Sequence, residues 1–444
     1  MSELEADATL FKPRSNLLPT MYACHQQLYT APLGDAGTVQ AVRQQFAARN
    51  WHQAVAGGRS VAIACGSRGI DRIDLVIKTL VQLVQESGGV PFVFPAMGSH
   101  GGATAEGQRE VLATLGVTEA SIGCPIRSSI QTVTLGHTQA GLPVYLDEHA
   151  SGADAILAVN RIKPHTNYVG PVESGLMKML AIGMGKADQA VTIHALGIPG
   201  LRDQMPAVAR VVLQKAPVIG GLAILEDALH QVTRIEGLAP QTLEQQEQGL
   251  LAECRSWQAS LPVQQLDLLI VDEIGKEISG TGMDSKVVGR CRLLDFHAFA
   301  QPQIKVIAVL GLTAATAGNA VGIGMADITT RRVAEGVDRL STYRNGVISH
   351  SPAMAAMPVT VETDAEAIRT ALDYLCNPKP IDQIRVIRIR NTLQLANLEV
   401  SQPVAQQLND HPTIRLSPHG QPMTFTPEGR LWPLRNKPAE GKLS

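Results

Sequence analysis

The sequence predicts an α/β protein: two α/β domains built from βαβ units, with an active-site cleft between them. Two observations predict this class. Short apolar runs recur along the chain, and each ends in a loop that contains glycine or polar residues. Segments whose apolar residues repeat at helical spacing separate these runs. At 444 residues, the chain is long enough for two or three domains with a substantial core.

The first βαβ unit is predicted near residue 60. Residues 60–65 (SVAIAC) have the pattern of a buried strand, and residues 71–89 have that of a helix that Gly88 stops. Residues 90–95 (VPFVFP) follow as the next strand. The loop AMGSHGGAT then leads into a helix that Thr104 can cap and that ends near Gly116. The order strand, helix, strand predicts a parallel sheet.

A third strand is predicted at residues 153–160 (ADAILAVN), and it leads into an unusual segment. Residues 163–180 (KPHTNYVGPVESGLMKML) match neither helix nor strand, although they carry many reactive side chains. Ligands of parallel sheets collect at the loops that follow the carboxyl ends of the strands. The loops after the three strands carry Arg68, His100 and His165. We therefore expect these three residues to lie in one site.

The second half of the chain repeats the alternation of strands and helices. Its predicted elements are a connecting helix, two strands, a helix with a capping box formed by Thr363 and Glu366, and a half-buried strand: 241–261, 266–275, 303–312, 363–375 and 384–391.

A domain boundary is expected near residue 262. Residues 1–262 would form an N-terminal α/β domain that carries the cofactor and the catalytic loops. Residues 263–435 would form a C-terminal α/β domain that closes the cleft, and residues 436–444 a disordered tail.

Composition excludes several classes of protein. A formal net charge of −2 without a basic stripe predicts no nucleic-acid partner. No apolar run reaches the ~20 residues that span a bilayer, and the acidic first residues lack the apolar segment of a signal peptide. The six cysteines are scattered without a CxxC pair, which is typical of reduced thiols. The sequence therefore predicts a soluble, cytoplasmic protein that does not bind membranes.

Three glycine-rich stretches compete for a functional interpretation. Residues 181–189 (AIGMGKADQ) lack the first glycine and the hydroxyl residue of a phosphate loop, which excludes that motif. Residues 318–327 (GNAVGIGMAD) have glycines in the wrong order for dinucleotide binding and are interpreted as a flexible loop. Residues 280–290 (GTGMDSKVVGR) form either a solvated loop or the far wall of the cleft.

The histidines offer acid/base and metal-binding chemistry. A lone histidine is more often structural than functional, and His194, in the apolar context AVTIHALG, is ambiguous by itself. His100 stands among glycines that let the backbone approach a ligand, and His165 follows a strand and a proline. Together with Lys178 and Arg68, these histidines indicate a metal site or an anionic substrate.

The stretches GSRG, MGSHGG, KPH, SGLMKM and IHALG together resemble the nickel-pincer lactate racemase family of 2-hydroxyacid racemases and epimerases. The resemblance implies a nickel cofactor, pyridinium-3,5-bisthiocarboxylic acid mononucleotide (nickel-pincer nucleotide). It implies that Lys178 binds this cofactor covalently and that His194, sixteen positions later (194 − 178), ligates nickel. His100 and His165 match the family's two base histidines, and Arg68 matches the arginine that holds the substrate.

By this resemblance the protein is a racemase or epimerase of a 2-hydroxy acid, possibly in the form of a sugar acid, that works by hydride abstraction and return. The partners so implied are a small hydroxy acid and the enzymes that assemble the cofactor. The resemblance covers the first ~200 residues, and the family's C-terminal Gln and Lys have no clear counterpart; Lys286 and Arg290 are candidates. Two alternatives stay open: an epimerase at another carbon or a dehydratase on the same scaffold, and a non-catalytic protein that binds nickel or the nucleotide.

Overall fold

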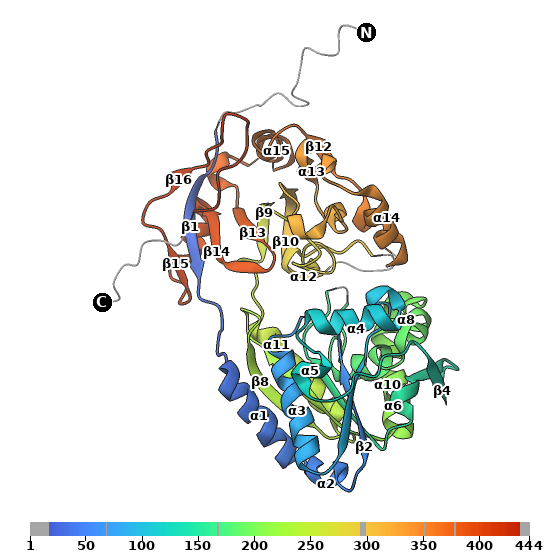
Figure 1. Ribbon diagram of the computed structural model, residues 1–444. Coiled ribbons are helices and arrows are strands. Elements are labelled where there is room, and N and C mark those ends of the chain that lie inside the picture. Colours follow the sequence, from blue (N-terminus) through green and yellow to red (C-terminus); the bar gives the residue numbers. More distant parts are fainter. Residues whose placement is uncertain are drawn as a thin grey trace. The chain divides into compact units, whose positions relative to one another are not determined.

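The computed structural model describes residues 17–67, 69–166, 168–293, 299–349, 351–376 and 379–435. The chain divides into two compact units, each described here by itself. One unit is Tyr29–Gln258, which we call the inserted unit. The other, the flanking unit, combines the chain before Tyr29 with the chain from Ala259 onward. Both units contain mixed sheets and helices (Figure 1), which confirms the α/β class.

The division differs from the expected one at its amino end. The boundary expected near residue 262 lies close to Ala259. The first strand, β1 (Thr20–Gln26), however, pairs antiparallel with β14 (Gln394–Ser401) and so belongs to the flanking unit. Its partner is more than 370 residues away in the sequence, and no local pattern reports such a pairing. The predicted tail, residues 436–444, lies outside the described residues.

The inserted unit is built on a five-stranded sheet in the order β3-β2-β6-β7-β8. The first four of these strands are parallel, and β8 pairs antiparallel with β7. A separate hairpin is formed by β4 and β5. The strands are β2 (Ser60–Cys65), β3 (Val90–Pro95), β4 (Thr132–His137), β5 (Pro143–Asp147), β6 (Ala155–Arg161), β7 (Val218–Glu226) and β8 (Val232–Leu238).

Helices cover both faces of this sheet. Alternate residues of β2 point to opposite faces: Val61 and Ile63 pack with α1 and α3, whereas Ala62 and Ala64 pack with α10 and α11. The helical segments of the unit are α1 (Gly34–Ala48), α2 (Trp51–Val55), α3 (Ile73–Glu86), η1 (Gly101–Ala103), α4 (Ala105–Thr114), α5 (Glu119–Ile122), α6 (Glu148–Ser151), α7 (Leu176–Lys178), η2 (Met179–Gly183), α8 (Lys186–His194), α9 (Gly197–Pro199), η3 (Gly200–Gln204), α10 (Met205–Lys215) and α11 (Leu243–Trp257).

The elements predicted for the first half of the chain are confirmed. The strands at 60–65 and 90–95 have the expected bounds, and the predicted third strand corresponds to β6. Helix α3 ends just before Gly88, whose φ of +79° suits glycine. The Thr104 hydroxyl accepts a hydrogen bond from the Gly107 N–H (3.0 Å) and caps α4 as predicted.

The flanking unit contains a nine-stranded mixed sheet in the order β12-β11-β10-β9-β13-β14-β1-β15, with β16 also paired to β1. Its remaining strands are β9 (Gln265–Val271), β10 (Gln303–Val309), β11 (Ile328–Thr330), β12 (Val359–Val361), β13 (Val386–Asn391), β15 (Ile414–Leu416) and β16 (Gln421–Pro422). Its helical segments are α12 (Ser285–Val288), η4 (Ala314–Thr316), η5 (Ile323–Met325), α13 (Arg331–Glu335), α14 (Arg339–Ile348), η6 (Pro352–Ala355), α15 (Asp364–Thr370), η7 (Ala371–Leu375), η8 (Ile381–Gln383) and α16 (Gln402–Leu408).

Two predictions for this unit need refinement. The Thr363 hydroxyl caps α15 as expected, but the Glu366 carboxylate accepts from the Glu362 N–H. Strand β13 is expected to be half-buried, yet both of its faces are largely buried, because Ile387 and Ile389 pack into one core cluster and Val386 packs into another. The buried guanidinium of Arg388 on this strand pairs with Asp272 and Glu399, which explains why a charged residue is tolerated there.

Candidate functional site

The carboxyl edge of the sheet in the inserted unit brings the predicted loops together. Strands β3, β2 and β6 are adjacent and parallel, with Cys65 opposite Pro95 and Ala64 opposite Ala158. The chain passes from β2 to β3 on one side, while β6 lies on the other side of β2. Strand order therefore reverses between β2 and β6, which is where open α/β sheets bind ligands.

The loops after β2 and β3 are joined by a direct hydrogen bond. Ser67 Oγ lies 2.6 Å from His100 Nδ1, and the His100 side chain is exposed. This contact engages one of the two ring nitrogens and fixes the orientation of the imidazole. Arg68, the neighbour of Ser67, lies outside the described residues.

The backbone beyond His100 requires glycine. Gly101 and Gly102 have φ values of +62° and +65°. A Cβ on Gly101 would lie 2.4 Å from the Gly107 carbonyl carbon, whereas a Cβ on Gly102 would meet no atom within 4 Å. The first glycine therefore permits close packing on α4, and the second leaves space beside the backbone.

The segment after β6 is irregular as expected, but its ends are fixed. Lys163 and Ser174 form an isolated antiparallel bridge with N–H to carbonyl distances of 2.8 and 3.2 Å. At the end of β6, Asn160 Nδ2 donates to the Gly175 carbonyl (2.7 Å). These bonds fold the thirteen positions between His165 and Lys178 (178 − 165) back onto the strand end.

A buried carboxylate organises the interior of this segment. Glu173 is fully buried, and it accepts hydrogen bonds from the backbone N–H groups of His165 and Gly170. The Arg255 guanidinium on α11 supplies a charged partner at 2.6 Å. Glu173 therefore holds the backbone at His165 from inside the loop.

The ring of His165 packs against a buried tyrosine. The His165 and Tyr168 ring centroids are 4.7 Å apart with the planes tilted by 38°. The Tyr168 hydroxyl donates to the Glu173 carbonyl at 3.1 Å. Burial, together with the nearby Glu173 charge, raises the pKa of Tyr168 well above its usual range, so this hydroxyl stays protonated.

Lys178 is the last residue of α7, directly before the π-helical turn η2. Its side chain is half-buried, whereas Met177 and Met179 on either side are buried. Such π-helical turns inside helices are frequent at functional sites. The apolar surroundings expected for this lysine are thus present.

His194 lies at the exposed carboxyl end of α8. The start of the same helix is anchored by the buried Lys186, whose ammonium contacts Asp147 (3.1 Å), Gln108 (3.1 Å) and the Pro95 carbonyl. Burial lowers the pKa of Lys186, although Asp147 opposes this shift. Lys186 therefore ties α8 to the end of β3, consistent with the exclusion of a phosphate loop at this place.

The turn η2 and helix α8 also pack closely on the loops after β2 and β3. A Cβ on Gly66 would lie 3.1 Å from Met179 Cε. A Cβ on Gly98 would lie 2.9 Å from Ala190 Cβ and 3.6 Å from Ile182 Cγ2. The Ser67–His100 pair and the helices that carry Lys178 and His194 thus belong to one packed cluster.

Sequence reasoning missed the residues that hold this cluster in place: Ser67, Glu173, Glu247 and Arg255. Glu247 had a detectable signal, because Leu243, Leu250, Leu251 and Cys254 define the apolar face of α11 and Glu247 lies on it. It is buried, and its carboxylate accepts from the Met177 N–H at 2.9 Å. The other three are polar residues in ordinary contexts.

In the flanking unit, the loop 280–290 is structured by its own polar residues. Asp284 caps α12 by accepting from the Lys286 N–H (2.8 Å). The Arg290 guanidinium donates to Asp327 and to the carbonyls of Met325, Ile304 and Lys305. Arg290 therefore anchors the loop.

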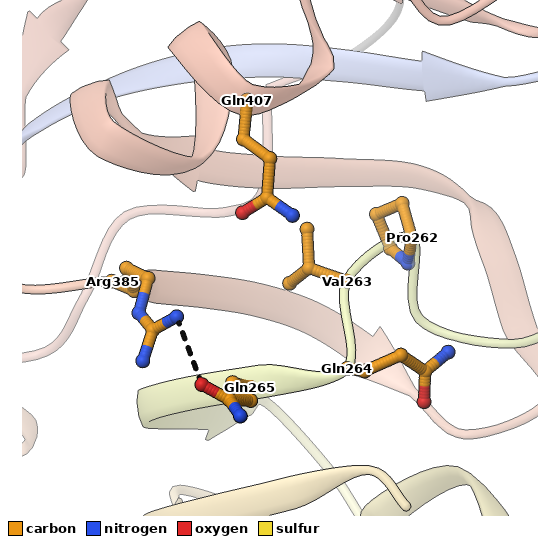
Figure 2. A pocket seen from close by; sticks show the side chains of 6 residues that line it. All are labelled: Pro262, Val263, Gln264, Gln265, Arg385 and Gln407. Carbon is orange, nitrogen blue, oxygen red and sulfur yellow. Dashed lines mark hydrogen bonds between the residues drawn. The ribbon is translucent and has the colours of Figure 1, made fainter.

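A pocket of about 300 Å³ lies at the amino ends of β9 and β13 (Figure 2). The Arg385 guanidinium reaches the Gln265 amide at 3.5 Å across it. Glutamine amides and one guanidinium supply no nucleophile or general base. The pocket also lies at the amino ends of the strands, whereas α/β sheets bind ligands at the carboxyl ends. Its lining residues are Pro262, Val263, Gln264, Gln265, Arg385 and Gln407.

Within the described parts of the chain, no group of three or more histidine, cysteine, aspartate or glutamate side chains is arranged to hold a metal ion. No helix there is long and apolar enough to cross a bilayer.

The solved structures that resemble this chain include a lactate racemase. A structure of the lactate racemase apoprotein from Thermoanaerobacterium thermosaccharolyticum resembles this chain with a TM-score of 0.47 and 13% sequence identity. The match covers 76% of this chain and 78% of that one. No family model and no curated protein sequence matches.

Proposed function

We propose that this protein racemises or epimerises a 2-hydroxy acid with the help of a nickel-pincer nucleotide tethered to Lys178. One observation carries the proposal. Two histidines, His100 and His165, stand on loops that leave the same edge of one parallel sheet, and the lysine-bearing turn packs against this edge. The sequence motifs around these residues resemble those of the nickel-pincer racemases, as described above.

Two bases suit inversion at a carbinol carbon. One imidazole takes the proton of the substrate hydroxyl, and the other returns a proton when the hydroxyl forms again on the opposite face. The Ser67 contact orients His100, while Glu173 and Tyr168 hold His165 in place. Arg68 is proposed to grip the substrate carboxylate, for which a guanidinium offers a bidentate geometry.

The residues fit the proposed cofactor. A lysine amine can form the covalent link, and imidazole is a suitable nickel ligand, so Lys178 would hold the nucleotide and His194 would bind the metal. A Cβ on Gly69 or Gly102 would meet no atom within 4 Å, so the backbone of both loops is open on that side. When bound, the cofactor would supply the acceptor that takes a hydride from the substrate carbon and returns it.

We further propose that the substrate is larger and more polar than lactate. The family's C-terminal Gln and Lys have no clear counterpart in this sequence, which favours a substrate whose additional hydroxyl groups are bound by other side chains, whereas lactate offers only a methyl group. A site that hydrogen-bonds those hydroxyls should discriminate against a substrate that lacks them by about 10⁴-fold.

The test uses protein co-expressed with the cofactor-assembly enzymes and a panel of hydroxy acids and uronates with three to six carbons. In heavy water, the inverted carbon should stay mostly unlabelled because the hydride returns to the carbon that it left. Deuterium at that carbon would contradict the hydride mechanism. Fastest turnover of lactate would contradict the proposed substrate size.

A further inference from the structure

We propose that helix α11 is the positioning element of the site, with Glu247 holding the turn that presents Lys178 and Arg255 holding the loop that presents His165. This inference rests on the proposed function for its chemistry, but the contacts that carry it are independent of any cofactor. Sequence reasoning treated the same stretch, 241–261, only as a connector.

Glu247 supports the start of α7. Its carboxylate accepts from the Met177 N–H at 2.9 Å, one residue before Lys178. It also lies so close to Gly175 that a Cβ there would be 2.2 Å from Oε1. A three-residue helix followed by a π-helical turn has few internal hydrogen bonds of its own. The buried carboxylate therefore supplies an acceptor that the local backbone lacks.

Arg255 supports the other half of the segment. Its guanidinium donates to Glu173 at 2.6 Å and to the Gly170 carbonyl at 2.9 Å. Glu173 in turn binds the His165 N–H. Arg255 lies eight residues after Glu247 (255 − 247), or about 12 Å along the helix at 1.5 Å per residue.

Through these two contacts, α11 sets the spacing of the segment 163–178. One rigid helix touches the segment near both of its chemical groups, so it fixes the separation of His165 and Lys178. Neither Glu247 nor Arg255 is proposed to touch substrate or cofactor. Both are positioning residues.

Hydrogen exchange of the cofactor-free full-length protein tests the geometry. In Glu247→Ala, the amide of Met177 should exchange at least tenfold faster than in wild type. Glu253→Ala is the matched control, because Glu253 is a half-buried residue of the same helix that pairs with Arg234 rather than with the segment 163–178. Equal exchange in wild type and Glu247→Ala would overturn the inference. If Glu247→Ala does not fold, Glu247→Gln, which keeps the shape and one acceptor oxygen, should show a smaller increase in the same amide.

Loading of Lys178 tests the consequence. With the assembly enzymes present, the fraction of protein that carries an adduct should fall at least fivefold in Glu247→Ala and recover partly in Glu247→Gln. Arg255→Gln should leave loading near the wild-type level but lower kcat, because it affects only the His165 half. Wild-type loading in Glu247→Ala would overturn the inference. So would an equal loss of loading in Glu247→Ala and Arg255→Gln. Wild-type protein that never acquires an adduct would instead contradict the proposed function.

Discussion

The two histidine loops differ in how the fold holds them. His100 is exposed, stands beside two glycines of positive φ, and is held by a side-chain contact from Ser67. His165 is held through its backbone by the buried Glu173 and through its ring by Tyr168. The comparison teaches that two histidines proposed for equivalent roles are supported by different parts of the fold. We expect the His165 loop to be coupled to global stability and the His100 loop to be nearly independent of it.

The largest effect is expected from Glu173→Ala. The substitution leaves the His165 and Gly170 N–H groups without their acceptor and removes the carboxylate that pairs with Arg255. The free energy of unfolding should fall by about 3–4 kcal/mol, as for other broken buried polar networks. Denaturant unfolding measures this. A loss below 1 kcal/mol would show that the His165 loop is held no more firmly than the His100 loop.

The second-largest effect is expected from the pH dependence of stability that Glu247 causes. Burial raises the pKa of Glu247 from 4.5 to about 7, although the Met177 and Leu176 N–H groups oppose the shift and Glu244 adds to it. A folded-state pKa above the unfolded value means that stability is full below pH 4.5 and is lost as pH rises toward 7. The loss should approach about 3 kcal/mol. Glu247→Gln should remove this pH dependence. The difference in unfolding free energy between wild type and Glu247→Gln should therefore change between pH 5 and 8. A constant difference over this range would contradict the raised pKa of Glu247.

A smaller effect is expected from Tyr168→Phe. The ring that packs on His165 stays, but the bond from the hydroxyl to the Glu173 carbonyl is lost. Thermal unfolding should report a loss of about 1 kcal/mol, the net value of one hydrogen bond. Tyr168→Leu removes the ring as well, and its kcat should be lower than that of Tyr168→Phe. Comparing the two variants separates the effect of the aromatic contact from that of the hydrogen bond. Equal kcat in the two variants would exclude a role for the ring in orienting His165.

Ser67→Ala should have the smallest effect on stability and a clear effect on rate. The bond is on the surface, so unfolding should change by less than about 0.5 kcal/mol. Loss of the contact with His100 should lower kcat about tenfold with little change in KM, which is less than the roughly 10²–10⁴-fold contribution of an acid/base group itself because the imidazole remains. Ser67→Thr keeps the hydroxyl and should restore most of the rate. A rate unchanged in Ser67→Ala would leave His100 without a defined orientation and weaken its role as a base.

Much of the fold could be predicted because local rules decide it. Buried strands such as 60–65 and 90–95 have unbroken apolar runs, and Gly88 and Thr104 end and begin helices by their own chemistry. The placement of β1 could not be predicted, because its partner β14 lies at the other end of the chain.

The site divides in the same way. The candidate site residues stand in recognisable motifs, so His100, His165 and Lys178 could be proposed from the sequence. The residues that support them act across the fold. Glu247 contacts a residue seventy positions away, and a carboxylate gives no local sign of that partner.

The central claim is that Lys178 carries the cofactor, and peptide mass analysis tests it most directly. Protein co-expressed with the assembly enzymes should show an adduct on the peptide that contains Lys178. Lys178→Arg should abolish the adduct, whereas Lys78→Arg, a change at an exposed lysine of α3, should leave it intact. An unmodified Lys178 peptide in a fully active preparation would contradict the account.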